Sequence, residues 1–297
     1  MHVTEHDGPA DLAGMQALAE RVFPQTRYRS VGDLAWNYAL SYDRPADNPS
    51  ALWRDGDQVV AWGWVERPAE LMLQVDPRYP GLARDVLAWA EQLAAAPLTV
   101  TVADTEAVVS AALVSAGYEM QDGPFFSCLS LTLPKATAEP ALPAGYRIRE
   151  VGADGARWVA VHRSAFGGSS FDGARRHQLA LVPPYRPELD LAVEAPDGTF
   201  AAYCLGWYDQ RNRTGLFEPV GASPDHRRLG LAAAVCRAVL ARLRDIGAQH
   251  AIVNARGDAD YPAPKRLYES LGFREDTRTR TYGQALVTDR AKQAAPR

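Results

Sequence analysis

The sequence predicts a mixed α/β (α+β) protein of two tandem domains, each with a mixed β-sheet flanked by helices. Its 297 residues are enough for two domains of ordinary size. Both halves show the same order of patterns: helices, a hairpin, a strand, a helix, a strand, and a short helix followed by glycine and an aromatic residue. We therefore expect an N-terminal domain over 1–133, a linker over 134–144, a C-terminal domain over 145–287 and a loose tail over 288–297.

The first half opens with two stretches that carry apolar residues at helical spacing, Asp11–Val22 and Val31–Leu40. Two β-like runs then flank Asp55-Gly56, a step that is typical of a tight hairpin turn. The later patterns predict a strand over Ala69–Val75, a helix over Leu82–Ala95, a strand over Leu98–Val102 and a short helix that ends at Ala116-Gly117.

The second half follows the polar, proline-containing stretch and repeats this order. Helical spacing covers Arg157–Phe166 and Asp172–Leu181, and the latter stops at Pro183-Pro184 because proline cannot continue a helix. Strands are predicted over Tyr146–Val151, Leu189–Glu194, Phe200–Tyr208, Leu216–Ala222 and Ala251–Ala255, a long helix over 231–246, and a last helix over Leu267–Leu271.

The composition argues against several classes of protein. The net charge of −4 lacks the basic surplus of a general nucleic-acid binder. No run approaches the roughly 18 apolar residues of a membrane span, and residues 1–7 do not resemble a secretory signal. The three cysteines form no Cys-x-x-Cys pair, and the six histidines lie scattered along the chain. We therefore expect buried free thiols, no metal site and a cytoplasmic protein.

The clearest chemical signal lies where a strand leads into a helix. The apolar strand Leu216–Ala222 is followed by a turn, Ser223–His226, and then by Arg227-Arg228-Leu229-Gly230-Leu231-Ala232, where the long helix begins. The first N–H groups of a helix lack acceptors within it and lie at the positive end of its dipole, so this segment predicts an anion site. Gly230 and Ala232 leave space for a phosphate to approach the main chain.

This segment and the later run Leu267-Tyr268-Glu269-Ser270-Leu271-Gly272-Phe273 together resemble the acetyl-CoA motif of the GNAT superfamily of N-acetyltransferases. The resemblance implies a partly splayed sheet and acetyl-CoA as a cosubstrate. It also implies that the pyrophosphate is held by the backbone amides of Arg228, Leu229, Gly230, Leu231 and Ala232. Arg227 and Arg228 would add positive charge, unless they only form a solvated start of the helix.

Further site residues follow from the resemblance. The backbone groups of Val220 and Ala222 correspond to those that pair with the pantetheine arm of coenzyme A. Tyr268 stands in the position of the tyrosine that serves the departing thiolate. Asn254, near the end of the next strand, would line the same opening or else belong to a turn at the strand end.

Acyl transfer from a thioester to an amine requires a neutral amine and a proton for the departing thiolate. Alternation along the strand places Glu218 on the face of Val220, which makes Glu218 the candidate general base and Tyr268 the candidate general acid. The alternatives are a solvated Glu218 on a strand edge and a half-buried Tyr268 on an amphipathic helix. Tyr261 and Pro264 stand where the family often has Asn and Ala, and these departures leave the catalytic details open.

The first half lacks the corresponding residues. In alignments without gaps, Pro80 falls opposite Arg227 and Leu113 falls opposite Tyr268. A two-residue gap would instead match Arg78-x-x-Gly81-x-Ala83 to the motif, but it leaves a very short loop. Proline removes an N–H donor from the anion site, and leucine cannot act as an acid. We therefore expect the N-terminal domain to be a degenerate, non-catalytic copy.

The leading functional prediction is an N-acetyltransferase that moves an acetyl group from acetyl-CoA directly to a primary amine of a small molecule or peptide. The alternative is a non-enzymatic acyl-CoA-binding or sensing module, which needs only the anion site. We expect no nucleic-acid or membrane partner, and a monomer or a homodimer. The amine would lie near Phe166, Phe171, Tyr203, Trp207 and Asp209, although aromatic residues in such places more often belong to the core.

Overall fold

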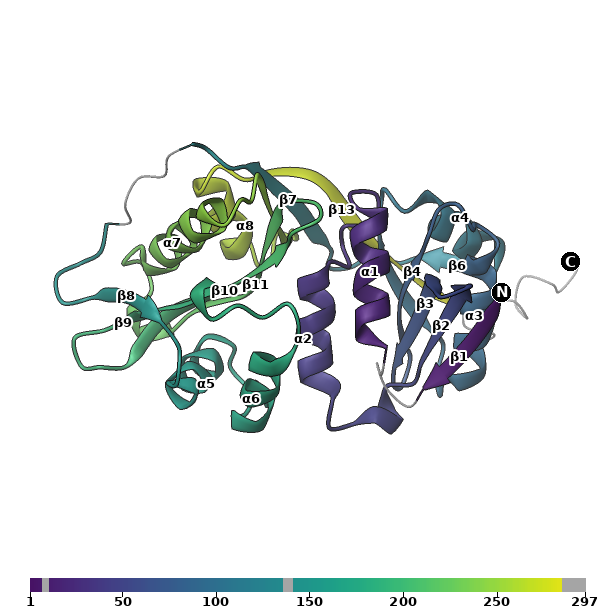
Figure 1. Ribbon diagram of the computed structural model, residues 1–297, viewed down its shortest axis with the longest axis horizontal. Helices are drawn as coiled ribbons and strands as arrows, with labels where there is room; N and C mark the ends of the chain where they lie inside the picture. Colours follow the sequence, from purple (N-terminus) through teal and green to yellow (C-terminus); the bar gives the residue numbers. More distant parts are fainter. Residues whose placement is uncertain (7–10, 136–140, 285–297) are drawn as a thin grey trace, which may run out of the picture. The chain divides into compact units, whose positions relative to one another are not determined.

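The computed structural model divides the chain into two compact units, and each is described by itself (Figure 1). The described residues are 1–6, 11–135 and 141–284. Among these residues, unit 1 consists of those within 1–29, 41–126 and 277–284. Unit 2 consists of residues 30–40 and 127–276.

Each unit includes residues from the other expected domain. Residues 30–40 and 127–133 belong to unit 2, and residues 277–284 belong to unit 1. The expected division at the linker, 134–144, assigns residues to domains strictly in chain order. The contacts instead assign these segments to the unit formed mainly by the other half of the chain. Linker residues 136–140 and the expected tail, 288–297, lie outside the described residues.

Unit 1 has a mixed sheet in the order β1-β2-β3-β4-β5-β13, and β6 also pairs with β13. Its strands are β1 (His2–His6), β2 (Ser50–Asp55), β3 (Gln58–Glu66), β4 (Glu70–Val75), β5 (Thr99–Ala103), β6 (Tyr118–Met120) and the later part of β13 (Arg274–Gln284). Its helices are α1 (Leu12–Val22), α3 (Leu82–Leu93) and α4 (Ala107–Ser115), with a short 3₁₀ helix over Pro45–Asp47. α1 packs on β3, and α3 packs on β3 and β4 with α4 beside it. Among the described strands of this unit, β4 and β5 form the parallel pair.

Unit 2 has its own mixed sheet in the order β7-β12-β11-β10-β9-β8. Its strands are β7 (Phe126–Thr132), β8 (Arg147–Glu150), β9 (Asp190–Glu194), β10 (Phe200–Asp209), β11 (Thr214–Ala222) and β12 (His250–Arg256). Its helices are α2 (Val31–Ser41), α5 (Gly155–Ala165), α6 (Gly173–Leu181), α7 (Leu231–Asp245) and α8 (Ala263–Ser270), with 3₁₀ turns over Pro187–Leu189 and Pro224–His226. α5 and α6 lie on one face of this sheet, and α7 and α8 lie on the other (Figure 1).

The apolar stripe predicted for the long helix is buried against the unit 2 sheet. Val235, Val239 and Leu243 of α7 are fully buried in one cluster with strand residues. The helix lies so close that a Cβ on Gly206 would stand 2.6 Å from Val239, and one on Gly215 would stand 2.4 Å from Leu243. Burying each such side chain stabilises the fold by roughly 1.5–3 kcal/mol. This packing holds the first turn of α7 at a set position relative to β11.

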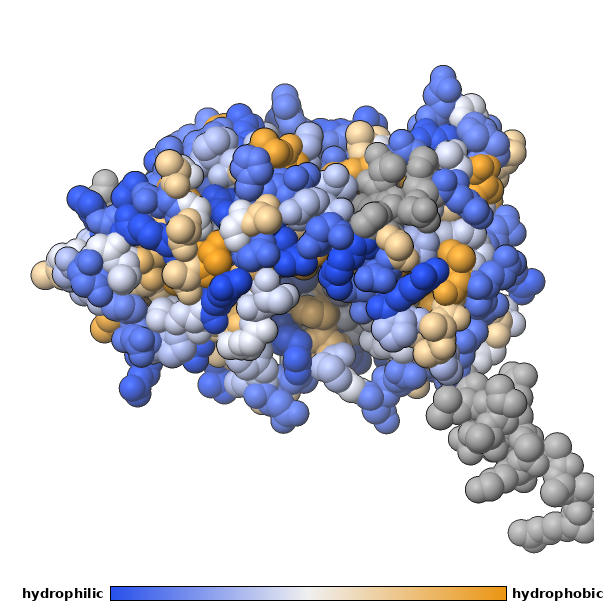
Figure 2. Space-filling view, turned by 90° about the horizontal axis from the view of Figure 1, so that it is seen from below, coloured by the Kyte–Doolittle hydropathy of each residue, from blue (hydrophilic) through white to orange (hydrophobic). Residues whose placement is uncertain are grey.

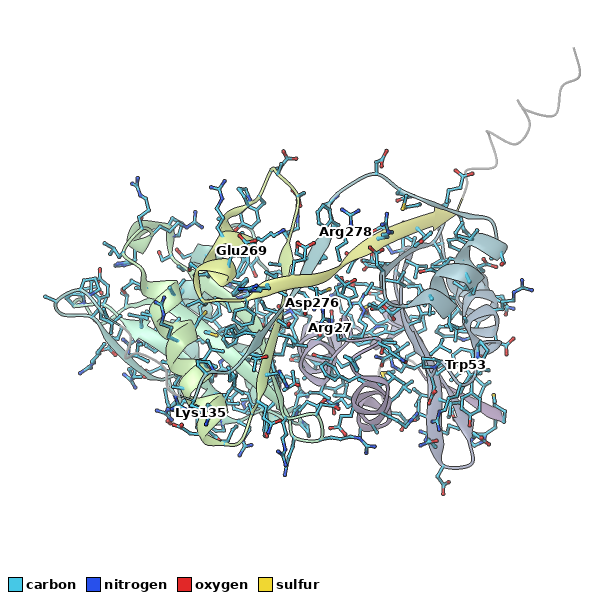
Figure 3. The ribbon with its side chains drawn as sticks, turned by 90° about the horizontal axis from the view of Figure 1, so that it is seen from above. Arg27, Trp53, Lys135, Glu269, Asp276 and Arg278 are labelled. Atoms are coloured by element: carbon cyan, nitrogen blue, oxygen red, sulfur yellow. The ribbon has the colours of Figure 1, made fainter. Side chains whose placement is uncertain are left out.

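Four strands have no counterpart among the predicted elements: β1, β6, β7 and β13. β13 alternates threonine and arginine over much of its length, and Asp276 and Arg278 lie along it (Figure 3). It pairs with β5, where Thr279–Gly283 run antiparallel to Thr99–Ala103, and with β6 on its other side. The strand exists because a partner edge is available, which a pattern of polar residues does not indicate.

Hydrophilic residues cover most of the face drawn in Figure 2. Apolar residues appear on that face as small, separate groups. Within the described part of the chain, no helix has both the length and the apolar character needed to cross a membrane.

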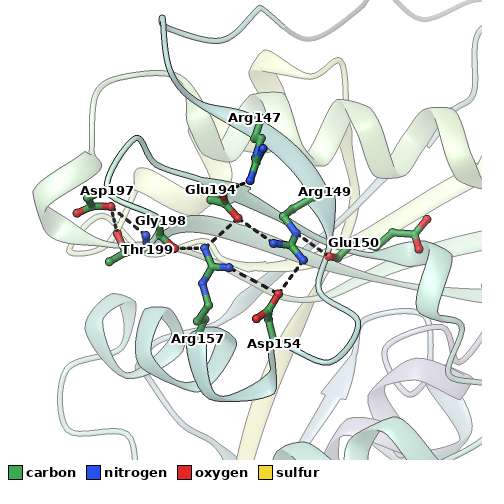
Figure 4. A network of polar contacts seen from close by, with 9 residues as sticks. All are labelled: Arg147, Arg149, Glu150, Asp154, Arg157, Glu194, Asp197, Gly198 and Thr199. Atoms are coloured by element: carbon green, nitrogen blue, oxygen red, sulfur yellow. Dashed lines mark hydrogen bonds and ion pairs between the residues drawn. The ribbon is translucent and has the colours of Figure 1, made fainter.

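In unit 2, the carboxylate of Glu194 on β9 forms ion pairs with three arginines (Figure 4). Glu194 is 7% exposed, accepts hydrogen bonds from Arg149 Nη1 at 2.9 Å and from Arg147, and pairs with Arg157 Nη2 at 2.9 Å. Arg147 and Arg149 come from β8 and Arg157 comes from α5, so the carboxylate joins an edge strand and a helix to the sheet. The hydrogen bond from Arg149, followed by those from Arg147 and Arg157, lowers the pKa of Glu194 from 4.5 to about 2.

We predict that Glu194→Gln lowers the melting temperature near neutral pH and that this deficit disappears in acid. The pKa of Glu194 is depressed in the folded state, so its contribution is fully present above about pH 4.5 and is lost as pH falls toward about 2. Thermal melts of both proteins across this range measure the effect. Glu269→Gln, on an exposed residue of α8 (Figure 3), is the control and should show no such convergence. A deficit that stays constant down to about pH 2 would contradict the prediction.

Candidate active site

An opening in the unit 2 sheet begins where β11 and β12 stop pairing. The two parallel strands pair over Thr214–Leu216 and His250–Ile252, whereas β11 continues to Ala222 and β12 continues past Asn254. β10 remains paired with β11 as far as Ala222. The carboxyl ends of β11 and β12 therefore part, which confirms the splay expected from the resemblance. Asn254 is half-buried on the parted section of β12.

The backbone groups of Val220 and Ala222 are directed toward this opening. Successive residues of a strand direct their N–H and C=O groups to opposite neighbours. At the end of β11, Ser223 N–H donates to Ala201 O at 2.9 Å, on the side of β10. The alternate residues Ala222 and Val220 therefore direct theirs to the other side, where β12 has moved away. This edge can pair with an extended ligand that carries amide groups.

A run of backbone amides stands at the start of α7 without acceptors from the protein. Among the described residues, the N–H groups of 228–233 donate no hydrogen bond, and the first helical bond runs from Ala234 N to Gly230 O at 3.0 Å. Arg228 and Gly230 have φ values of 65° and 76°, in the left-handed region. Such left-handed residues turn neighbouring N–H groups toward one concave surface, which suits an anion. The Arg227 and Arg228 side chains are exposed beside it.

In the corresponding turn of unit 1, several backbone N–H groups are already hydrogen-bonded or absent. Leu82 N donates to Tyr79 O at 3.0 Å, Arg78 N donates to Asp76 Oδ1 at 3.0 Å, and Pro80 has no N–H to offer. Asp76 is 2% exposed, so a carboxylate already occupies the neighbourhood of this turn. Burial would raise the pKa of Asp76, but hydrogen bonds from Arg78 outweigh it and lower the pKa to about 2.

Glu218 lies at a β-bulge on β11. Between two paired positions, β11 has Glu218 and Pro219 where β10 has only Leu205. Val220 packs against the apolar cluster beneath α7, whereas Glu218 follows Leu216 to the opposite face, which contacts α2. The expectation that Glu218 shares a face with Val220 is therefore wrong, because simple alternation does not continue through a bulge.

The surroundings of Glu218 raise the pKa of its carboxyl group. Its side chain is half-buried, and its main-chain oxygen accepts a hydrogen bond from Trp207 Nε1 at 2.6 Å. Burial raises the pKa of Glu218 to about 8, and the nearby charge of Asp33 on α2 adds to the rise. A carboxyl that titrates near the working pH can both accept and release a proton, as a general base must.

Tyr268 is held by the way α8 ends. Gly272 has a φ of 96°, Gly272 N donates to Glu269 O at 3.0 Å, and Phe273 N donates to Tyr268 O at 3.1 Å. This is a glycine-terminated helix cap, and it explains the Gly-Phe pair after the helix. Tyr268 is 6% exposed, and its ring centroid lies 6.4 Å from that of Phe217.

The Tyr268 hydroxyl stays protonated over the physiological range. Burial is the main cause that raises its pKa well above 10, and the neighbouring thiols of Cys236 and Cys204 add to the rise. Among the described residues, no hydrogen-bond partner for this hydroxyl is found. It can therefore donate its proton to a ligand beside it.

The residues expected around the acceptor belong mainly to the core. Phe171 is 1% exposed, and Tyr203 and Trp207 are completely buried. Asp209 is also buried, whereas Phe166 is 41% exposed at the end of α5. Four of these five side chains are thus packed inside unit 2, as the alternative interpretation held.

α2 is the element that the sequence analysis did not connect with this site. A Cβ on Gly32 would lie 2.6 Å from the Trp207 ring and 2.7 Å from Leu216, so α2 touches β10 and β11. Trp36 stacks on Phe171 with ring centroids 5.2 Å apart. In the sequence, Gly32 was the residue that could have indicated this contact, because glycine within a helix is unfavourable unless another element approaches closely.

The three cysteines are free and buried. Cys204 and Cys236 lie in the same apolar cluster as Tyr268. Within the described residues, no group of three histidine, cysteine, aspartate or glutamate side chains is arranged to hold a metal ion.

Known proteins resemble this chain both locally and over nearly its full length. Residues 169–273 match the model of the acetyltransferase (GNAT) family. A mycothiol acetyltransferase from Thermobispora bispora is 27% identical over 290 residues, which cover 92% of this chain and 96% of that protein. A mycothiol acetyltransferase from Kineococcus radiotolerans is 36% identical over 144 residues, which cover 46% of this chain and 45% of that protein.

Two solved structures share the fold. A GCN5-related N-acetyltransferase from Sphaerobacter thermophilus superposes with a TM-score of 0.62 at 20% identity and covers 95% of each chain. A tandem GNAT protein from the clavulanic acid biosynthesis pathway superposes with a TM-score of 0.65 at 15% identity, covering 95% of this chain and 98% of that one. Residues 169–273 therefore match a GNAT acetyltransferase domain, while the whole chain is similar to a named acetyltransferase and shares the fold of a tandem GNAT protein.

Proposed function

We propose that unit 2 transfers an acetyl group from acetyl-CoA directly to the primary amine of a small molecule or peptide. The observation that carries this proposal is the run of unbonded amides over 228–233, next to the parted ends of β11 and β12. A diphosphate fits the first feature, and an extended arm with amide groups fits the second. Coenzyme A combines both.

Each binding residue has a defined part in the proposal. The pyrophosphate lies on the backbone amides of Arg228, Leu229, Gly230, Leu231 and Ala232. The Arg227 and Arg228 side chains add charge-assisted contacts at the exposed rim. Val220 and Ala222 pair with the pantetheine arm through the free edge of β11, and Asn254 lines the opposite wall on β12.

The reaction needs one proton removed from nitrogen and one delivered to sulfur. Glu218, when ionised, takes a proton from the attacking amine directly or through a water, and a C–N bond forms at the thioester carbonyl. The C–S bond then breaks, and Tyr268 donates its proton to the departing sulfur. Glu218 gains as many protons as Tyr268 loses, so the products are an amide and a free thiol with no net proton change.

Unit 1 is, in this proposal, a degenerate copy that does not bind acetyl-CoA. The bonded amides near Tyr79 and the buried Asp76 carboxylate support this part of the proposal. Leu113, which aligns with Tyr268, is fully buried and has no proton to donate.

The acceptor is the least specified part. The name of the relatives, mycothiol acetyltransferase, makes a mycothiol-related amine the first acceptor to test. The alternative of a binding or sensing module without catalysis is disfavoured by the match of residues 169–273 to an acetyltransferase family. A panel of amines with thiol release from acetyl-CoA as the readout separates the two.

The first prediction concerns the anion site. Gly230→Glu should weaken acetyl-CoA binding by at least about 100-fold, because it puts a carboxylate among the phosphate-binding amides and strains a left-handed residue. Isothermal titration with acetyl-CoA measures the effect. Gly152→Glu is a matched control, since Gly152 is exposed, has a positive φ of 53°, and would carry a Cβ with no atom within 4 Å. Equal losses in both variants would argue against a specific site at Gly230.

The second prediction concerns the pH dependence. At saturating substrates, kcat should rise with pH along a limb near pH 8, because Glu218 must lose its proton to act. Glu218→Gln should remove this limb and lower kcat by about 100-fold. Asp33→Asn should move the limb to lower pH, since it removes the charge that helps to raise the pKa of Glu218. A limb that persists in Glu218→Gln would assign the base to another group.

The third prediction concerns the acid. Tyr268→Phe should lower kcat by about 10–1,000-fold and leave the affinity for acetyl-CoA within a few-fold of the original. Thiol release and calorimetry on the same preparation separate the two quantities. Tyr146→Phe, a hydroxyl removed elsewhere in unit 2, should leave kcat unchanged. If Tyr268→Phe retains full kcat, proton delivery to sulfur does not pass through this residue.

A further inference from the structure

The end of β11 depends on packing against its two faces for its position. Past Leu216 the strand is paired with β10 on one side, while its other edge faces the opening. Its position perpendicular to the sheet is therefore set by what packs on its two faces. α7 covers one face through the cluster that includes Val220, and the other face is held by β10 side chains and α5.

Contacts on the α5 face converge on the last residues of β11. A Cβ on Gly221 would lie 2.7 Å from Tyr203 Cε1, 2.9 Å from the Tyr203 hydroxyl and 2.9 Å from Ala165 Cβ. The Tyr203 ring therefore lies directly over the main chain between Val220 and Ala222. Only glycine at position 221 allows this approach.

The Tyr203 ring is in turn held by a buried histidine. His162 on α5 is 5% exposed, and its Nδ1 lies 2.7 Å from the Tyr203 hydroxyl. Its Nε2 lies 3.1 Å from Ser169 Oγ, and its ring stacks on Trp158 with centroids 5.1 Å apart and planes 8° apart. Both ring nitrogens are engaged, so the imidazole cannot rotate without losing a bond.

Burial also keeps this histidine neutral. It lowers the pKa of His162 to about 4, and the charge of Arg163 contributes to the fall. A neutral imidazole has one N–H and one lone pair, which matches its two hydroxyl partners. The arrangement is thus a fixed support rather than a group that changes charge in the physiological range.

We propose that His162 is a positioning residue that acts through Tyr203 to hold the cofactor-facing end of β11. The inference rests on the proposed binding of acetyl-CoA along that strand. Without the His162–Tyr203 bond, the ring can shift over Gly221, and the backbone groups of Val220 and Ala222 lose their alignment with the pantetheine arm. Small displacements of positioning groups are costly because binding geometry tolerates little error.

A variant series separates positioning from mere packing. Tyr203→Phe keeps the ring and removes the hydroxyl, and His162→Leu removes both bonds of the imidazole. Each should raise the Kd for acetyl-CoA by about 3–10-fold, the range expected for one buried hydrogen bond. The KM for acetyl-CoA should rise in parallel, with a smaller change in kcat. His162→Asn, whose amide can replace Nδ1, should restore much of the affinity.

Tyr185→Phe is the matched control. Tyr185 also has a hydroxyl hydrogen bond, to Asp190 Oδ2 at 2.7 Å, and this bond is partly buried. Asp190 pairs with Leu205, opposite the bulge in β11, and not with the residues opposite the last positions of β11. This variant should lose thermal stability and keep its affinity for acetyl-CoA. All titrations are made well below the melting temperature of each variant.

The outcomes distinguish a failure of the proposed function from a failure of the positioning role of His162. If the unaltered protein does not bind acetyl-CoA, the proposed function fails. If it binds, and Tyr203→Phe and His162→Leu bind as tightly as Tyr185→Phe does, His162 is only a core residue and the positioning role is overturned. Should His162→Leu fail to fold, Tyr203→Phe decides alone, because it retains the packed ring.

Discussion

The structure of unit 2 depends on one constraint: β11 pairs with β12 for a short distance and then continues with one free edge. A free strand edge presents unpaired N–H and C=O groups, which need a partner when they are shielded from water. Here the adjoining turn ends in a helix whose first amides are also unbonded. The two features give unit 2 two groups of unbonded backbone donors and acceptors, one on the edge of β11 and one at the start of α7, and they are separated by a turn whose N–H groups at 223, 226 and 227 are bonded.

Unit 1 has a similar parting of two parallel strands, but its strands carry no bulge there and the turn that follows is bonded differently. β4 and β5 also pair over a short stretch, at Glu70–Leu71 and Thr99–Val100, before both strands continue. However, β3 and β4 keep an unbroken register, so no bulge redirects a side chain as at Glu218. The turn after β4 satisfies its own donors through main-chain bonds and the Asp76 carboxylate. The parting of the strands therefore belongs to the fold, whereas the bulge and the unbonded amides of unit 2 depend on a few residues placed on it.

α2 makes unit 2 dependent on the first half of the chain. Trp36 stacks on Phe171 in the buried aromatic group beneath α5, and Gly32 lets the helix approach β10 and β11. The same helix carries Asp33, whose charge helps to raise the pKa of Glu218. A segment from the first half thus contributes both packing and electrostatics to the candidate site.

The sequence by itself determined the features that depend on neighbouring residues. Apolar spacing predicted α1 and α7 to within a few residues, and the turn before Leu231 and the Gly272-Phe273 cap carried recognisable local signatures. Only the tertiary structure decided the bulge at Glu218, the strand β13 and the place of α2. These depend on which surface stands opposite a segment, and that surface comes from residues far away in the chain. Local patterns record the period of a helix or strand, but they do not record the partner against which it packs.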